Sequence, residues 1–194
     1  PGQILRINLS NKTSETVDRS ALFDRWRGGT GVATQLLLEE CPPETAYPDS
    51  PIIFAIGPLN LYYPCAAKTV AMFKSPLTGN LGESYAGGKV GMAMQLAGHD
   101  AIVITGKLDA PHYLLIQDDS VEFRDAHALW GLSARATGRI LKEKAPGEGR
   151  RSIVRFGVVG EKEVRYSMVV ADTVHHRGIH RLGWVLGVNV VYRE

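Results

Sequence analysis

The stretch that decides the fold is Lys74-Ser75-Pro76-Leu77-Thr78-Gly79, followed six residues later by Tyr85-Ala86-Gly87-Gly88. Its composition predicts a tight turn, then a loop that reaches Ala86, and then a glycine pair where an apolar-patterned helix over residues 88–97 begins. Main-chain N–H groups at such a helix start bind anions such as phosphate. Because neither Gly87 nor Gly88 has a side chain that would block the approach, we predict that the pair binds a phosphate group.

Outward from this stretch, the chain combines hairpins, short apolar strands and amphipathic helices. Strands often cluster before helices, which favours an α+β fold with antiparallel or mixed sheets over a strictly alternating one. Each half of the chain contains a hairpin, a helix and a strand in similar order. Strands are predicted over residues 3–9, 13–17, 51–56, 68–73, 101–105, 112–117, 120–124, 152–156, 164–170 and within 183–192, and helices over 18–27, 32–40, 88–97 and 132–144.

Two loops in the first half carry expectations of their own. Gly28-Gly29-Thr30-Gly31 is predicted to be a flexible connection, because glycine is a poor helix former. Tyr62-Tyr63-Pro64 lies in a loop rich in aromatic residues and proline, and we expect its rings to pack against one another or against the protein.

Composition and charge limit the classes of function. The chain has 194 residues with 44% hydrophobic and 22% charged residues, enough for a sizeable core. It has no apolar stretch long enough to span a membrane and no signal-peptide pattern at its start, so a cytoplasmic protein is expected. Residues 139–194 carry 11 Lys/Arg against 6 Asp/Glu. This excess suits an anionic partner, but it lacks the aromatic interleaving expected of a nucleic-acid surface.

Side chains that could carry chemistry by themselves are few. Cys41 and Cys65 are too far apart for a CxxC pair and cannot alone hold an iron–sulfur cluster or a structural zinc ion. Glu83 and Asp100 have no partner at a spacing typical of general acid–base catalysis, so we interpret them as solvated carboxylates or turn caps. No catalytic residue is predicted.

The order of several short motifs carries more information than any one of them. Together they resemble the N-terminal domain of the aldehyde ferredoxin oxidoreductase family, the tungsten-dependent, in some members molybdenum-dependent, pterin enzymes. The similarity runs from Ile4 to about Val191. Its landmarks are Gly28-Gly29-Thr30-Gly31, Ala55-Ile56-Gly57-Pro58-Leu59, Lys74 to Gly79, Gly87-Gly88, Leu96 to Ile104, Trp130-Gly131, Gly160-Glu161 and Gly183-Trp184-Val185-Leu186-Gly187.

The resemblance implies a fold and a cofactor. The fold is a base of two β-sheets with flanking helices, built as duplicated halves, and residues 1–194 are expected to form this single domain. Tungstopterin or molybdopterin lies against the base, with its phosphates bridged by magnesium. The 4Fe–4S cluster belongs to later helical domains that this chain lacks, so a cluster-bearing helical domain or subunit is the implied partner. Ferredoxin is implied as an indirect partner, and pairing as a homodimer is common in the family.

The resemblance also assigns cofactor-binding roles to residues around the glycine pair. Lys68 stands where the family has an arginine near the pterin and the cluster, although lysine lacks the planar fork of arginine. An exposed strand lysine without a role is the alternative. Tyr85 stands where the family has an asparagine whose main-chain carbonyl faces magnesium, the alternative being a ring that packs on the neighbouring sheet. Gly87 and Gly88 are assigned to the phosphates, the alternative being an ordinary helix entry.

A second cofactor loop is implied near the C-terminus, at His175, His176, Arg177 and Arg181. Without a gap the two family arginines fall on His175 and Ile179, and with a local shift they fall on Arg177 and Arg181. The small residues of the family loop are replaced here by larger ones, Ile179, Leu182 and Trp184. The three histidines of this region lack a carboxylate or cysteine partner in sequence and do not predict a zinc site.

Two functions from different classes follow. In the first, the chain is the cofactor-binding domain or subunit of an enzyme that oxidises aldehydes to carboxylic acids and transfers electrons to ferredoxin. In the second, it is a catalytically silent relative that acts as a structural subunit or cofactor carrier, which the altered second loop and Lys68 favour. A fragment of a longer protein is a third reading. Neither nucleic acid nor a membrane is expected as a partner.

Overall fold

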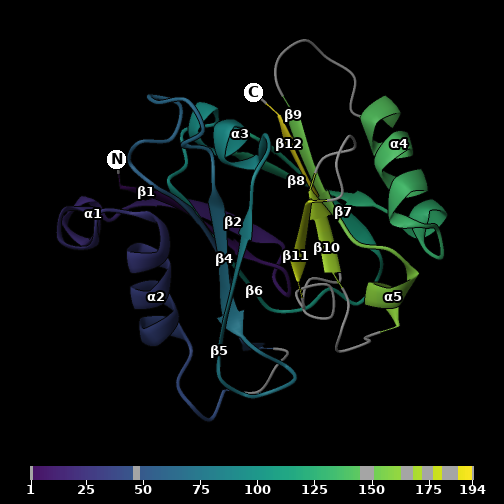
Figure 1. Ribbon diagram of the computed structural model, residues 1–194. Helices are drawn as coiled ribbons and strands as arrows, with labels where there is room; N and C mark the ends of the chain where they lie inside the picture. The colour runs from purple at the N-terminus through teal and green to yellow at the C-terminus, as the bar shows by residue number, and fades with distance from the viewer. Residues whose placement is uncertain are drawn as a thin grey trace.

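The computed structural model describes residues 2–45, 49–144, 151–162, 168–171, 177–180 and 188–193. These residues form two six-stranded mixed sheets with flanking helices (Figure 1). The predicted α+β class, with two sheets and flanking helices, is therefore confirmed.

The first sheet belongs to the N-terminal half. Its strand order is β2-β1-β6-β3-β4-β5, and only the β1–β6 pair is parallel. Central β3 reads Ile-Ile-Phe-Ala-Ile and is buried at all five positions, as expected of a strand covered on both faces. The strands are β1 (Gln3–Asn8), β2 (Thr13–Asp18), β3 (Ile52–Ile56), β4 (Thr69–Lys74), β5 (Leu81–Ala86) and β6 (Ala101–Thr105).

The second sheet repeats this topology in the C-terminal half. Its order is β11-β10-β9-β12-β7-β8, again with one parallel pair, β7–β12. Read from β8, each strand matches its counterpart in the first sheet, which confirms the predicted duplication. The strands are β7 (His112–Gln117), β8 (Ser120–Asp125), β9 (Arg151–Arg155), β10 (Met168–Ala171), β11 (Arg177–His180) and β12 (Val188–Arg193).

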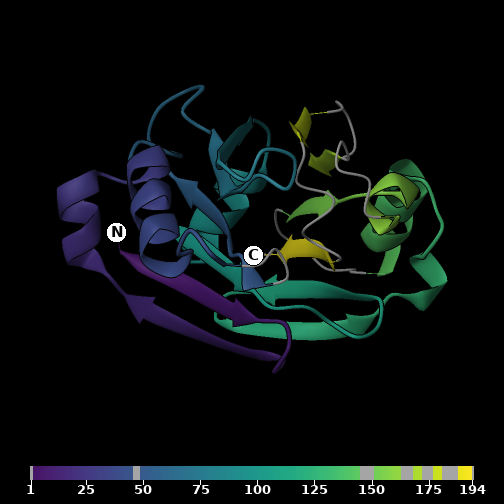
Figure 2. The ribbon, with the colours of Figure 1, turned by 90° about the horizontal axis from the view of Figure 1, so that it is seen from below.

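The helices cover opposite ends of this pair of sheets. Figure 2 shows α1 and α2 beside the first sheet and α4 beyond the second. The inner faces share one apolar core with α3, to which both halves contribute strand residues. The helices are α1 (Ser20–Trp26), α2 (Gly29–Glu40), α3 (Val90–Leu96), α4 (Ala134–Lys144) and α5 (Val158–Glu161), with a 3-10 turn at His127–Leu129.

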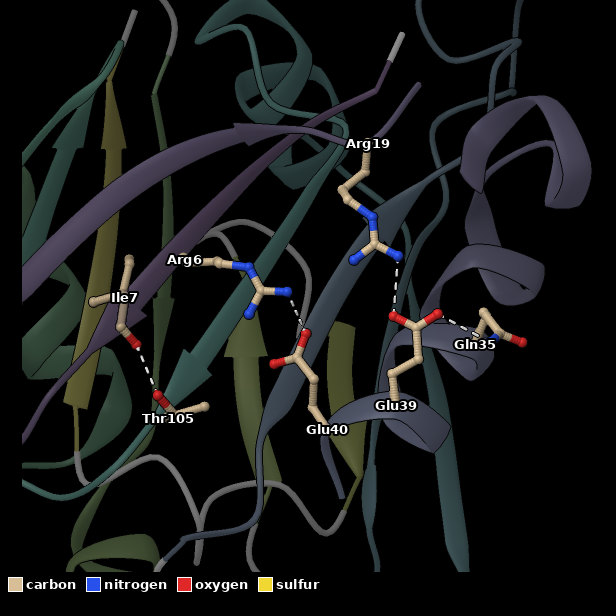
Figure 3. A network of polar contacts seen from close by, with 7 residues as sticks. All are labelled: Arg6, Ile7, Arg19, Gln35, Glu39, Glu40 and Thr105. Atoms are coloured by element: carbon tan, nitrogen blue, oxygen red, sulfur yellow. Dashed lines mark hydrogen bonds and ion pairs between the residues drawn. The ribbon is translucent and has the colours of Figure 1, made fainter. Parts of the chain in front are cut away.

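Polar contacts fasten α2 to the hairpin beside it (Figure 3). Arg6 in β1 donates to Glu40 over 2.6 Å, and Arg19 donates to Glu39 over 3.0 Å. The Gln35 amide also donates to Glu39, and this bond, together with Arg19, holds the pKa of the Glu39 carboxyl below its ordinary value. The C-terminal end of α2 is therefore fixed to the sheet by two ion pairs.

Polar contacts also join the first half to the β7–β8 hairpin of the second half. Thr16 donates its hydroxyl to Asp119 over 2.9 Å, and the buried His99 donates Nε2–H to the Asp118 carbonyl over 2.7 Å. Lys12 lies 3.3 Å from His112 Nε2. His112 donates Nδ1–H to a carbonyl, so its Nε2 accepts from the ammonium group.

Several expectations were wrong in detail. Residues 81–86 form the edge strand β5 and not a loop, because the β4 ladder pairs a segment that shows no apolar alternation. The Gly28–Gly31 segment is not a flexible loop, since α2 begins at Gly29. Helix α3 begins at Val90, two residues after the glycine pair. Tyr62 and Tyr63 do not pack inward, for they are 74% and 64% exposed.

Candidate functional site

Strand register brings distant parts of the first half to one end of the first sheet. Ile56, Thr69 and Ala86 form one row across β3, β4 and β5. The residues next to this row at the same end are therefore Gly57, which follows β3, and Lys68, which precedes β4. Gly87 follows β5 at that end as well. The sheet therefore places Gly57, Lys68 and Gly87 side by side, each next to the end of its strand.

The start of α2 reaches the same place. Gly28 has φ +95°, and a Cβ built there would lie 2.9 Å from the Ile56 carbonyl oxygen, so only glycine allows this close approach. Gly29 also faces Gly57, since a Cβ built on Gly29 would lie 3.9 Å from the Gly57 Cα, an ordinary van der Waals contact. We call this end of the sheet the glycine edge. It comprises Gly28, Gly29, Gly57, Lys68, Gly87 and Gly88.

The predicted anion-binding residues of the first half are accessible here. Gly87 and Gly88 are half-buried, and Lys68 is exposed. Gly88 has φ +102°, a conformation that disfavours any side chain. Lys68, Gly87 and Gly88 therefore lie at one end of the sheet, beside the α2 residues Gly28 and Gly29 that the sequence analysis listed only as landmarks.

A chain of hydroxyl groups connects α2 to the edge strand. Thr30 Oγ1 lies 2.8 Å from the Tyr85 phenol oxygen, and that phenol donates to Glu83 over 3.3 Å. Tyr85 is 47% exposed, so its ring lies on the surface next to the first turn of α2. The Glu83 carboxylate adds negative charge at this point. Sequence spacing could not reveal the contact, because Thr30 and Tyr85 are far apart in the chain.

The Lys74–Gly79 motif lies at the opposite end of the sheet from the glycine edge. Lys74 closes β4, and the turn after it is held by a bond from the Gly79 amide to the Ser75 carbonyl over 2.8 Å. The Lys74 ammonium donates to the carbonyls of Pro43 and Thr45 over 2.6 and 3.0 Å. With six residues in β4 at about 3.3 Å each, this turn is far from Gly87 and Gly88, so the motif serves the fold.

The second predicted cofactor loop is only partly within the described residues. Arg177 opens β11, and the backbone of β11 approaches that of β5, the edge strand that leads to Gly87. His175, His176 and Arg181 lie outside the described residues. Across the described part of the chain, no group of three His, Cys, Asp or Glu side chains is placed to hold a metal ion.

The other groups singled out in the sequence have structural partners. Asp100 accepts from the amides of Gly2 and Gln3 over 2.6 and 3.1 Å, and so fixes the start of β1. Cys41 is half-buried and Cys65 exposed, and both are free thiols. Within the described residues, no helix has the length and apolar character needed to cross a membrane.

Comparison with known proteins relates this architecture to one family. The model of the aldehyde ferredoxin oxidoreductase N-terminal domain matches residues 4–191. Tungsten-containing aldehyde ferredoxin oxidoreductases of Pyrococcus horikoshii and Pyrococcus furiosus are 36% and 32% identical over 190 residues, covering 96% of this chain and 31% of each relative. The WOR-like subunit of an aliphatic sulfonate oxidoreductase from P. furiosus is 29% identical, covering 96% of this chain and 32% of that subunit.

A solved structure agrees with the sequence matches. The active-site complex BamBC of benzoyl coenzyme A reductase, determined with 1,5-dienoyl-CoA, contains a chain that superposes with a TM-score of 0.92 at 30% identity. The match covers 99% of this chain and 30% of that one. The chain thus spans about a third of the length of its relatives. It belongs to the aldehyde ferredoxin oxidoreductase family and corresponds to the N-terminal domain.

Proposed function

We propose that this chain is the pterin-binding domain or subunit of an aldehyde ferredoxin oxidoreductase-like enzyme. The observation that carries the proposal is the glycine edge, where five glycines from three loops and one lysine gather at the end of one sheet. Main chain without side chains admits a large anionic group, and the Lys68 ammonium supplies a compensating charge. Family membership supports tungstopterin or molybdopterin as the cofactor.

The residues present fit the phosphate end of such a cofactor. Gly87 and Gly88 are partly accessible and Lys68 is exposed, which supports this assignment. Helix α3 has seven residues, so we assign the anion to the loop amides and Lys68 and not to a helix dipole. We further propose that the Tyr85 carbonyl faces a bridging magnesium ion, and that His175, His176, Arg177 and Arg181 contact the pterin from the second half.

The complete enzyme would oxidise an aldehyde to a carboxylic acid. The bound metal–pterin group supplies that two-electron chemistry, while this domain binds and orients it and balances its phosphate charge. Residues 1–194 would act as one domain. Electrons would reach ferredoxin through a 4Fe–4S cluster held by a later helical domain or a partner subunit. The relatives named above differ in substrate, so the aldehyde would be selected outside the glycine edge.

Metal and pterin analysis of the purified protein tests the proposal. Expression in a host that makes the cofactor should give tungsten or molybdenum near one equivalent per cofactor site, together with pterin fluorescence. Protein that is folded by circular dichroism but contains neither metal nor pterin, with or without a co-expressed helical partner, would contradict it.

Charge substitution tests the assigned site directly. Lys68→Gln should weaken pyrophosphate binding several-fold in a calorimetric titration, because it removes a cation from the glycine edge. The matched control is Lys142→Gln on the exposed face of α4, which makes the same charge change at the far end of the molecule. Equal weakening in both variants would show that the anion responds to net charge only.

A catalytically silent relative is the second candidate function. The observation that favours it is Glu83, whose carboxylate accepts from Tyr85 at the border of the glycine edge and opposes an anion there. On this reading Glu83→Gln creates pyrophosphate binding that the unmodified protein lacks. Binding in the unmodified protein that exceeds that of Lys68→Gln would reject it.

A further inference from the structure

The side chain of Asn60 is buried in an otherwise exposed loop, and only one of the two polar atoms of its amide group is hydrogen-bonded. Asn60 is 2% exposed, whereas its neighbours Leu59 and Leu61 are 55% and 38% exposed. Its amide nitrogen donates to the Gly91 carbonyl over 2.7 Å and to the Gln95 side-chain oxygen over 2.8 Å. A main-chain carbonyl only accepts hydrogen bonds, so the Asn60 atom that faces the Gly91 carbonyl is the amide nitrogen. The amide oxygen, Oδ1, therefore points away from that carbonyl.

Asn60 Oδ1 and the hydroxyl of Thr69 share an unusual property. Both atoms are buried, and neither has a hydrogen-bond partner among the described residues. Thr69 is 0% exposed. Buried polar atoms in folded proteins are nearly always paired with protein or with ordered water, since an unpaired one loses its hydration without compensation. Two such atoms close together therefore indicate a shared partner.

Gly91 shows that the two atoms lie near the same point of the main chain. A Cβ built on Gly91 would lie 3.0 Å from Thr69 Oγ1 and 3.2 Å from Asn60 Oδ1, with an Ile56 methyl at 3.3 Å. The side-chain position of Gly91 is thus surrounded by one hydroxyl, one amide oxygen and one apolar group. We propose that a single internal water molecule binds beside Gly91, donating to Asn60 Oδ1 and accepting from the Thr69 hydroxyl.

The chemistry of the site selects water over other ligands. The two polar atoms facing it are neutral, so an ion would be poorly compensated, and both are closed to solvent, so a cofactor cannot reach them. Water both donates and accepts, as an amide oxygen and a hydroxyl require, and internal waters bridge such groups. This water joins the loop before Lys68, the start of β4 and the start of α3, three segments that support the glycine edge.

Thr69→Val tests the proposal because the sign of the effect differs between a hydrated and a dry site. With the water present, the substitution removes one of its partners, and we expect the melting temperature to fall by about 2–4 °C. In a dry site it removes an unsatisfied hydroxyl, so the melting temperature stays the same or rises, which would overturn the proposal. The control is Thr137→Val. The Thr137 hydroxyl is also buried without a partner among the described residues, but nothing places a second unpaired polar atom beside it. We therefore expect no fall in the melting temperature of this variant.

A direct observation on the unmodified protein covers the case in which the variant fails to fold. A crystal structure at high resolution should show an ordered oxygen within hydrogen-bond distance of both atoms, and water-selective NMR should give a cross-peak to the Gly91 α-protons. A direct Thr69–Asn60 hydrogen bond with no water between them would reject the proposal.

Discussion

The two halves of the molecule have the same inner face and different outer faces. In the first half, Leu5 pairs with Ile102, and Ile102 pairs in turn with Phe54. In the second half, Leu114 holds the place of Leu5 and Val154 that of Phe54, with Val190 between them. Leu5, Phe54, Leu114 and Val154 all lie in the shared core. The inner faces stay apolar because they pack against each other.

The outer faces differ because different helices cover them. Ala55 pairs with Val70 under α2, whereas its counterpart Arg155 pairs with Val170 and is only 3% exposed. Arg155 donates to the Ala134 carbonyl at the start of α4. A buried guanidinium therefore occupies the position that alanine has in the first half. The comparison teaches that the duplicated core constrains one side of each sheet and leaves the other free to change.

Equivalent truncations in the inner core should give the largest effect. Leu5→Ala and Leu114→Ala each remove a fully buried side chain at the same place in the repeat, and each should lower the free energy of unfolding by about 2–5 kcal/mol. Urea denaturation measures both. A large loss for one variant and almost none for the other would show that the halves do not contribute equally to the shared core.

Gly138 tests the outer face of the second half. A Cβ there would lie 2.4 Å from Arg155 Nε and 2.6 Å from Cζ, so Gly138→Ala should destabilise the protein by about 1–3 kcal/mol despite the better helix propensity of alanine. The double variant with Arg155→Ala should lose less than the sum of the two single variants. Strict additivity would show that Gly138 does not exist to accommodate Arg155. Arg139→Ala, exposed on the same helix, is the control.

The contact between α2 and β5 tests what is special to the first half. Tyr85→Phe removes the hydroxyl that contacts Thr30 and Glu83, and should cost about 0.5–1.5 kcal/mol in denaturation experiments. Thr30→Val should lower the free energy of unfolding by a similar amount, and the double variant should lower it no more than either single variant. Independent, additive losses would contradict a shared hydroxyl chain.

The ion pair at the end of α2 should give the smallest effect, visible as a pH dependence. The pKa of Glu39 is lowered from its ordinary value of 4.5 by the Gln35 hydrogen bond and by Arg19. The ionised Glu39 carboxylate therefore contributes fully to folding stability above pH 4.5, and this contribution is lost as the pH falls through the lower pKa of the folded state. Because both side chains are about a third exposed, we expect less than about 1 kcal/mol. Between pH 3 and 5, the free energy of unfolding of Glu39→Gln should therefore change less with pH than that of the control Glu143→Gln on α4, by about 1 kcal/mol at most.

Local patterns predicted the elements whose own residues determine them. The apolar run of β3 and the hairpin around Asp118 could be read directly, and Gly98, with φ +86°, follows the C-cap of α3, where glycine is common. Strand β5 could not be predicted, because Leu-Gly-Glu-Ser-Tyr-Ala has no apolar alternation and gains its structure from the β4 ladder. The first turn of α2 was missed because glycines disfavour a helix, and the close approach of Gly28 to the Ile56 carbonyl, which only glycine allows, is a tertiary contact.

The sequence by itself determined the α+β class and the family, since apolar periodicity and the order of short motifs are properties of neighbouring residues. Tertiary structure alone decided which glycines share a site. Residues 28, 57, 68 and 87 meet only because strand register aligns the ends of β3, β4 and β5, and it sends the Lys74–Gly79 turn to the opposite end. That register depends on which faces of the paired strands are buried and on the turns that join the strands, so it is defined only once strands from separate parts of the chain have paired.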